Sequence, residues 1–165
     1  MSIPIPYWKE PQNCAPGELA AFAATVREGG EVIGEGLDER IKQAVRLIFC
    51  QHEGRLVGVA ALKTPLDSYR FKLSRKSGVQ LPRDACPHEL GWVFVTPSER
   101  GKGLSANLVA CAIEGLNSPV FATSRTDNAP MHATLRRVGF VAVGDEYKSD
   151  QGEHRLQIFT REGKG

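Results

Sequence analysis

Residues 100–105, Arg-Gly-Lys-Gly-Leu-Ser, have the composition of an anion-binding turn. They follow a β-forming run that ends near Val95, and Leu104 begins an apolar helical pattern. The first N–H groups of a helix lack partners within the helix, and the macrodipole makes this end positive. Gly101 and Gly103 have no Cβ, so backbone donors can approach a phosphate closely, and the neighbouring arginine and lysine add positive charge. The segment therefore predicts a site for a diphosphate.

Two other phosphate-binding motifs fit this segment less well. A P-loop requires Gly-x-x-x-x-Gly-Lys-[Ser/Thr], but its first glycine would fall on Thr96 and its hydroxyl residue on Gly103. A dinucleotide fingerprint requires Gly-x-Gly-x-x-Gly, and its third glycine would fall on Ala106. The fingerprint stays open as a variant ending in alanine, but the acidic ribose-binding residue expected about 20 residues later at a strand end is missing.

The cysteines do not form a recognisable framework. The chain has four of them: Cys14, Cys50, Cys86 and Cys111. None forms a Cys-x-x-Cys pair, so we expect free thiols in a reducing compartment. Cys50 with His52 and Cys86 with His88 have the residue types of zinc ligands. In the expected strand order, however, the two pairs lie at opposite ends of the sheet, so no metal site is predicted.

A family resemblance adds to this interpretation. Residues 89–105 resemble the central motif of GNAT-type N-acetyltransferases, [Gln/Arg]-x-x-Gly-x-[Gly/Ala], which lies between the fourth strand and third helix of that fold. Asn128 and the later Gly139-Phe140 resemble the family's Asn…Gly-Phe segment. Ser105 departs from the motif's last position, where it can narrow the phosphate cradle or add a hydroxyl donor. The resemblance is firm over residues 89–140 and, by element order, extends to one domain over 1–165.

The resemblance implies transfer of an acetyl group from acetyl-CoA to a primary amine, by direct attack in a ternary complex. Glu89 matches the family's general base, and Gly91, on the same face of the strand, would leave room for a substrate. The alternative for Glu89 is a solvated carboxylate at a strand end. The residues implied for acetyl-CoA binding, by backbone or side chain, are Val93, Phe94, Val95, Arg100, Gly101, Lys102, Gly103, Leu104, Ser105 and Asn128.

The general acid is less well defined. Many relatives place a tyrosine four residues before the Gly-Phe, and Leu135 stands there in this chain. Tyr147, in the expected last hairpin, is the candidate for the catalytic acid, and its alternative is a packing role. His132 is a second candidate. The thiolate can also leave to water without either group.

The surrounding pattern predicts a mixed, mostly antiparallel α/β sheet of about six or seven strands, flanked on both faces by about four helices. Helices are expected over 16–29, 36–43, 104–116 and 128–138, with a short basic helix near 69–76. Strands are expected over 45–52, 55–63, 89–95, 119–124, 140–147 and 154–160, with an edge strand within 3–8. The basic segment 69–76 can line an acceptor pocket that prefers a carboxylate or phosphate, or form a solvated face.

Composition places the chain among ordinary globular proteins. Its 165 residues carry a net charge of +2, with 24% charged and 41% hydrophobic residues. This balance argues against a nucleic-acid partner. Because no apolar run of about 20 residues and no signal-peptide pattern occurs, we expect a cytoplasmic protein without a membrane partner. The expected partner is a small-molecule or peptide amine, and a homodimer stays open as an alternative to a monomer. The functional alternatives are a non-catalytic acyl-CoA sensor and transfer of a different acyl group.

Overall fold

The computed structural model describes residues 3–30 and 34–163. It contains seven strands and five α-helices, so the predicted mixed α/β class is confirmed. The chain forms two compact units. The first comprises Met1–Lys63 and Leu90–Glu114, and the second comprises Thr64–Glu89 and Gly115–Gly165. Each is described by itself below.

The first unit is built on the strand order β1-β2-β3-β4. Its elements are β1 (Tyr7–Lys9), α1 (Pro16–Gly29), α2 (Leu37–Lys42), β2 (Arg46–His52), β3 (Arg55–Lys63), β4 (His88–Val95, from Leu90 on) and α4 (Leu104–Ile113). β1 pairs antiparallel with β2, and β2 pairs antiparallel with β3. The turn between β2 and β3 uses Glu53 and Gly54, both with positive φ, and this confirms the predicted hairpin.

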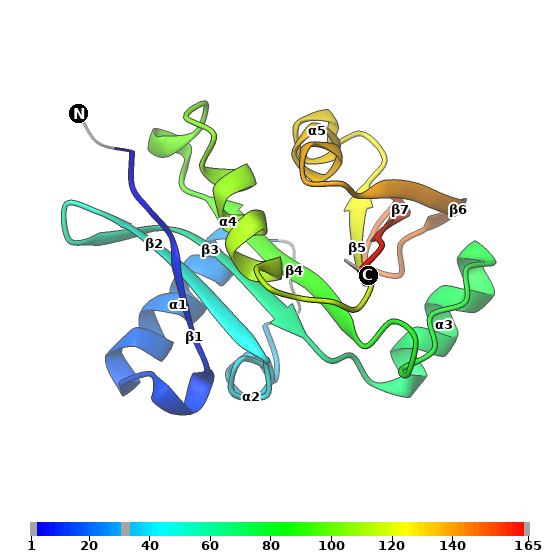
Figure 1. Cartoon of the computed structure of the whole chain (residues 1–165), viewed down its shortest axis with the longest axis horizontal. Helices are drawn as coiled ribbons and strands as arrows, with labels where there is room; N and C mark the ends of the chain where they lie inside the picture. Colours follow the sequence, from blue (N-terminus) through cyan, green and yellow to red (C-terminus); the bar gives the residue numbers. More distant parts are fainter. Residues whose placement is uncertain (1–2, 31–33, 164–165) are drawn as a thin grey trace. The chain divides into compact units, whose positions relative to one another are not determined.

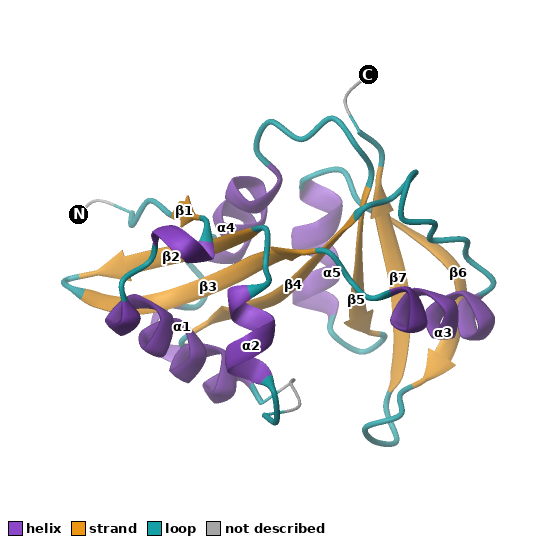
Figure 2. Cartoon of the chain, turned by 90° about the horizontal axis from the view of Figure 1, so that it is seen from below, coloured by secondary structure: helices purple, strands orange, loops and turns teal. Residues whose placement is uncertain are grey.

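Side-chain alternation on β2 and β3 directs apolar groups to both faces of these strands. Leu47 and Val59 belong to the core cluster with Phe22 of α1 and Ile41 of α2. Gly58, which precedes Val59, faces α4 instead: a Cβ built on Gly58 would lie 3.1 Å from the side chain of Leu108. Because successive strand residues point to opposite faces, α1 and α2 cover one face and α4 the other, as Figure 2 shows.

The second unit is built on the strand order β5-β7-β6, with both pairs antiparallel. Its elements are α3 (Asp67–Ser77), the first two residues of β4, β5 (Val120–Arg125), α5 (Ala129–Arg137), β6 (Val141–Lys148) and β7 (Arg155–Arg161). Ile158 of β7 packs in a core cluster with Leu73 of α3, whereas the ring of Phe159 lies 4.9 Å from that of His132 in α5. Helices α3 and α5 therefore cover opposite faces of these strands (Figure 1).

Element boundaries differ from the sequence expectation by a few residues. β1 is shorter than the expected 3–8 and begins at Tyr7, as is usual for an edge segment that contains prolines. α4 ends at Ile113 rather than near 116, because Gly115 adopts a φ of 74° that ends the helix. Among the described residues, no helix combines the length and apolar character needed to cross a bilayer.

Candidate active site

The predicted phosphate turn lies in the first unit, between β4 and α4. Gly101 has a φ of 83° and Gly103 a φ of 78°, both in the left-handed region that side-chain-bearing residues rarely adopt. No atom lies within 4 Å of a Cβ built on either glycine, so the space beside both is open. Gly103 is the N-cap of α4, and Leu104 and Ser105 are its first two residues. The turn therefore exposes backbone beside the positive end of a ten-residue helix.

The two cations of this turn have partners within the first unit. Arg100 donates from Nε to the carbonyl oxygen of Val95 at 2.9 Å, and its guanidinium lies 5.4 Å from the ring centre of Phe94. Lys102 Nζ lies 2.8 Å from Glu99 Oε2. Arg100 thus fastens the turn to the end of β4, while Lys102 shares its charge with a carboxylate.

Glu99 is the centre of this small network. Its side chain is buried, and it contacts the ammonium of Lys102 and the Nδ1 of His52. These two contacts hold the pKa of Glu99 below its usual range, with the Lys102 hydrogen bond as the larger cause. The carboxylate therefore stays ionised and holds the ammonium group of Lys102 beside Glu99.

β4 departs from regular strand geometry at Trp92. This residue has a φ of 53°, which is a genuine outlier for a bulky side chain. The ammonium of Lys63 lies 4.6 Å from the Trp92 ring centre. A Cβ built on Gly91 would approach Lys63 Nζ to 2.7 Å. The end of the flexible Lys63 side chain thus lies in the space that Gly91 was expected to leave for a substrate.

Glu89, the predicted base, lies at the start of β4 in the second unit. Its side chain is only 4% exposed, which contradicts the alternative of a solvated carboxylate. The hydroxyl of Tyr69, on α3, donates to Glu89 Oε2 at 2.9 Å. A buried carboxylate that accepts such a charge-assisted hydrogen bond is held in a defined orientation.

Tyr147, the predicted acid, belongs to the same unit and lies on β6. Its side chain is 6% exposed, and among the described residues its hydroxyl has no hydrogen-bond partner. Burial, followed by the charges of Glu89 and Asp150, raises its pKa well above the ordinary value. Tyr147 therefore remains protonated and can donate a hydrogen bond.

Three further residues that the sequence analysis discussed lie on or before α5. Asn128 caps this helix, because its Oδ1 accepts from the backbone N–H of Met131 at 3.2 Å. Leu135 is fully buried and offers only apolar surface. His132 Nε2 lies 2.8 Å from the carbonyl oxygen of Arg125, so this nitrogen carries the proton and donates it. That bond occupies one of the two ring nitrogens of His132, the second candidate for the acid.

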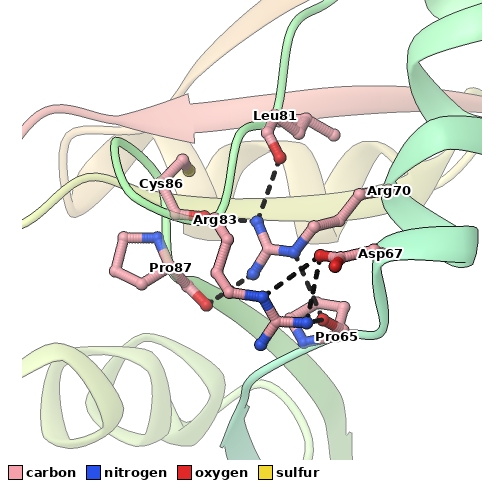
Figure 3. A network of polar contacts seen from close by, with 7 residues as sticks. All are labelled: Pro65, Asp67, Arg70, Leu81, Arg83, Cys86 and Pro87. Carbon is pink, nitrogen blue, oxygen red and sulfur yellow. Dashed lines mark hydrogen bonds and ion pairs between the residues drawn. The ribbon is translucent and has the colours of Figure 1, made fainter.

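The sequence interpretation missed the inward side of α3. Figure 3 shows Arg70 surrounded by the carbonyl oxygens of the segments on either side of the helix. Arg70 is 4% exposed, so the expectation of a solvated basic face is wrong here. The spacing of Tyr69, Leu73 and Ser77 at i, i+4 and i+8 places one side of α3 inward, and this periodicity was the available signal.

The predicted residues divide between the two units. The first unit holds Val93, Phe94, Val95, Arg100, Gly101, Lys102, Gly103, Leu104 and Ser105, and the second holds Glu89, Tyr147 and Asn128. Within the described part of the chain, no group of three or more His, Cys, Asp and Glu side chains could hold a metal ion. The four cysteines are free thiols.

The sequence and the fold were compared with known protein families and solved structures. A sequence model of the acetyltransferase (GNAT) family matches residues 6–140. No curated protein matches the sequence. Escherichia coli ElaA is 17% identical, with a TM-score of 0.68 over 97% of this chain and 100% of ElaA.

Two further solved structures give similar values. An acyl-CoA N-acyltransferase from Pseudomonas aeruginosa is 19% identical, with a TM-score of 0.67 over 96% of this chain and 99% of that one. The structure of yncA from Salmonella typhimurium, which contains its cofactor acetyl-CoA, is 14% identical, with a TM-score of 0.65 over 99% and 96% of the two chains. At these identities the similarity shows a shared fold.

Proposed function

The chain belongs to the acetyltransferase (GNAT) family, and on this basis we propose that it moves an acetyl group from acetyl-CoA to a primary amine by direct attack in a ternary complex. The observation that carries the proposal is the turn before α4, where Gly101 and Gly103 adopt left-handed φ values beside open space. A side chain at either glycine would add bulk where a diphosphate would approach the backbone.

The residues around this turn fit the donor. The turn and the N-terminus of α4 offer backbone N–H groups to the diphosphate, while Arg100 and Lys102 keep two positive charges near it. The backbone N–H groups of residues 93–95, just after the distortion at Trp92, polarise the acyl carbonyl. Asn128 is a further cofactor contact. When bound, acetyl-CoA supplies a thioester from which the acyl group can be transferred.

The buried groups of the second unit supply the proton chemistry. Glu89 accepts a proton from the attacking amine as the new C–N bond forms, and Tyr147 gives a proton to the departing thiolate as the C–S bond breaks. The lack of a partner for the Tyr147 hydroxyl among the described residues suits a group that donates to a substrate. Both residues then exchange protons with solvent to restore their starting states.

The acceptor is proposed to be an amine on a small molecule or a peptide. A second candidate function is an acyl-CoA sensor without turnover, which the buried aliphatic side chain of Leu135 at the family's usual tyrosine position favours. Transfer of a longer acyl group is a third. All three require acyl-CoA binding, so binding and turnover must be measured separately.

The first experiment measures donor binding as thermal stabilisation by acetyl-CoA. A ligand at 100 times its Kd stabilises the folded state by about 2.7 kcal/mol, which a melting curve detects. Gly103→Ala should weaken this stabilisation, because it adds a Cβ to the turn and strains a φ of 78°. Gly17→Ala is the matched control, since Gly17 lies within α1 with no atom near its Cβ position. An absence of stabilisation by any acyl-CoA would contradict both the transferase and the sensor.

The second experiment measures free CoA thiol released with a panel of amines. Release with any amine supports the transferase, and stabilisation without release supports the sensor. Glu89→Gln should lower the rate at neutral pH more than at high pH, where more of the amine is already deprotonated. A pH–rate profile unchanged by this substitution would remove Glu89 from the role of base.

A further inference from the structure

We infer that Tyr69 of α3 is a positioning residue for Glu89, and that α3 serves as the scaffold that holds this general base in place. The inference rests on the proposed function of Glu89 and deepens it. It starts from the hydrogen bond in which the Tyr69 hydroxyl donates to Glu89 Oε2 at 2.9 Å. Tyr69 and Glu89 lie 20 positions apart in the sequence, so the helix must be placed accurately for this bond to form.

Arg70, the neighbour of Tyr69, supplies that placement. Its Nε donates to the carbonyl of Pro65 at 3.2 Å, just before the helix. Its two terminal nitrogens donate to carbonyl oxygens of the segment after the helix, namely Leu81 at 3.1 Å, Cys86 at 2.6 Å and Pro87 at 2.6 Å. Pro87 is two residues before Glu89 (Figure 3). Adjacent residues of α3 thus hold the backbone that leads to the base and the side chain of the base itself.

Titratable groups from two elements lie around this pair. Tyr69 and Arg70 come from α3, and Tyr147 comes from β6; the negative charge of Glu89 acts on all three. Burial, followed by that charge, raises the pKa of Tyr69 well above 10, its ordinary value. The Tyr69 hydroxyl therefore stays protonated throughout the working range and acts as a permanent donor rather than as a second base.

A permanent donor has a kinetic consequence for the base. The hydrogen bond from the Tyr69 hydroxyl holds the Glu89 carboxylate in one orientation, in which it can accept the proton of the amine. Removing the hydroxyl should therefore reduce kcat more than it raises KM for the amine, by about tenfold for a hydrogen bond to a charged group, because the carboxylate loses its orientation.

The test is Tyr69→Phe, which removes one oxygen and keeps the ring. Tyr7→Phe is the matched control, because Tyr7 is on β1, where its ring stacks on Phe49. We expect kcat to fall in Tyr69→Phe alone, with KM for the amine little changed, and thermal stabilisation by acetyl-CoA to stay as in the wild type. The double variant with Glu89→Gln should be no slower than Glu89→Gln alone, since Tyr69 acts through Glu89.

Two results would overturn the inference, and they are distinguishable. If the wild type releases thiol with an amine and Tyr69→Phe has the same kcat, the positioning role is wrong while the proposed function stands. The same conclusion follows if Tyr69→Phe slows the Glu89→Gln enzyme by a further factor equal to its effect on the wild type. If the wild type binds acetyl-CoA but releases no thiol with any amine, the proposed function itself fails, and the role with it.

Discussion

Replacing Arg70 by methionine gives the sharpest test of how the second unit is held together. The substitution keeps a long unbranched side chain but removes the donors to four carbonyl oxygens, those of Pro65, Leu81, Cys86 and Pro87. A buried acceptor left without a donor costs about 1–3 kcal/mol. Pro82, Arg83 and Asp84 are exposed, so water can reach part of the segment after α3.

We therefore take about 1 kcal/mol for each of the four carbonyls and expect Arg70→Met to lower the free energy of unfolding by about 3–5 kcal/mol. This is a large share of the roughly 5–15 kcal/mol that stabilises a typical domain. The free energy of unfolding of Arg70→Lys should lie between those of the wild type and Arg70→Met. An ammonium can donate to at most three acceptors, and it lacks the planar fork of the guanidinium.

The assay is urea denaturation followed by circular dichroism, and the control is Arg75→Met on the same helix. Arg75 is exposed, with its guanidinium 5.8 Å from the ring centre of Phe71, so its loss should change the unfolding free energy by no more than about 0.5 kcal/mol. A loss below about 1 kcal/mol for Arg70→Met, close to that of the control, would refute the view that Arg70 fastens α3 to its flanking segments.

Three more predictions follow from the same unit. Hydrogen bonds from Lys76 and, to a smaller extent, Lys72 lower the pKa of Asp150 from 3.8 to about 2, so the folded state gains stability above pH 3.8 that is lost as the pH falls toward 2. Asp150→Asn should therefore make the melting temperature less dependent on pH in this window. An unchanged acid dependence in the variant would count against the pairing. Gly144→Ala should lower the free energy of unfolding, measured by urea titration, by about 3 kcal/mol. Gly144 has a φ of 73°, and a Cβ there would clash with Val79 and lie 2.8 Å from the carbonyl oxygen of Ser77. An unchanged free energy of unfolding would show that β6 can shift. Tyr147→Phe should lower kcat, most strongly with acetyl-CoA rather than with an activated thioester whose thiolate needs no proton, and equal losses with both donors would exclude the acid role.

Local signals in the sequence were sufficient for most elements and for the position of the glycine turn. Glycines 101 and 103 before an apolar helical pattern predicted a turn at a helix start, and the structure has a turn there, with both glycines in the left-handed region. Asn128, the first residue of the expected helix 128–138, caps α5. These features depend on residues within one turn of each other, so intrinsic preferences and capping chemistry decide them.

The remainder depends on contacts between distant residues, which the sequence pattern does not encode. Nothing in the basic run of α3 distinguishes Arg70, whose charge is buried among carbonyls, from Arg75, which is exposed. The bond from Tyr69 to Glu89 and the position of Lys63 over Gly91 likewise require the packed chain. The solvated alternatives fail at Glu89 and Arg70, because each of these buried groups has hydrogen-bond partners, as burial requires.

The distorted strand residue Trp92 has a consequence for spectroscopy. The chain has only two tryptophans, Trp8 and Trp92, and both belong to the first unit. Trp92 lies under the ammonium of Lys63 and directly before residues 93–95, so its emission should respond to a change in the charge or solvent around this strand. In a Trp8→Phe variant, fluorescence would come from one indole, and the chain would carry its own optical label on the donor side without any added dye.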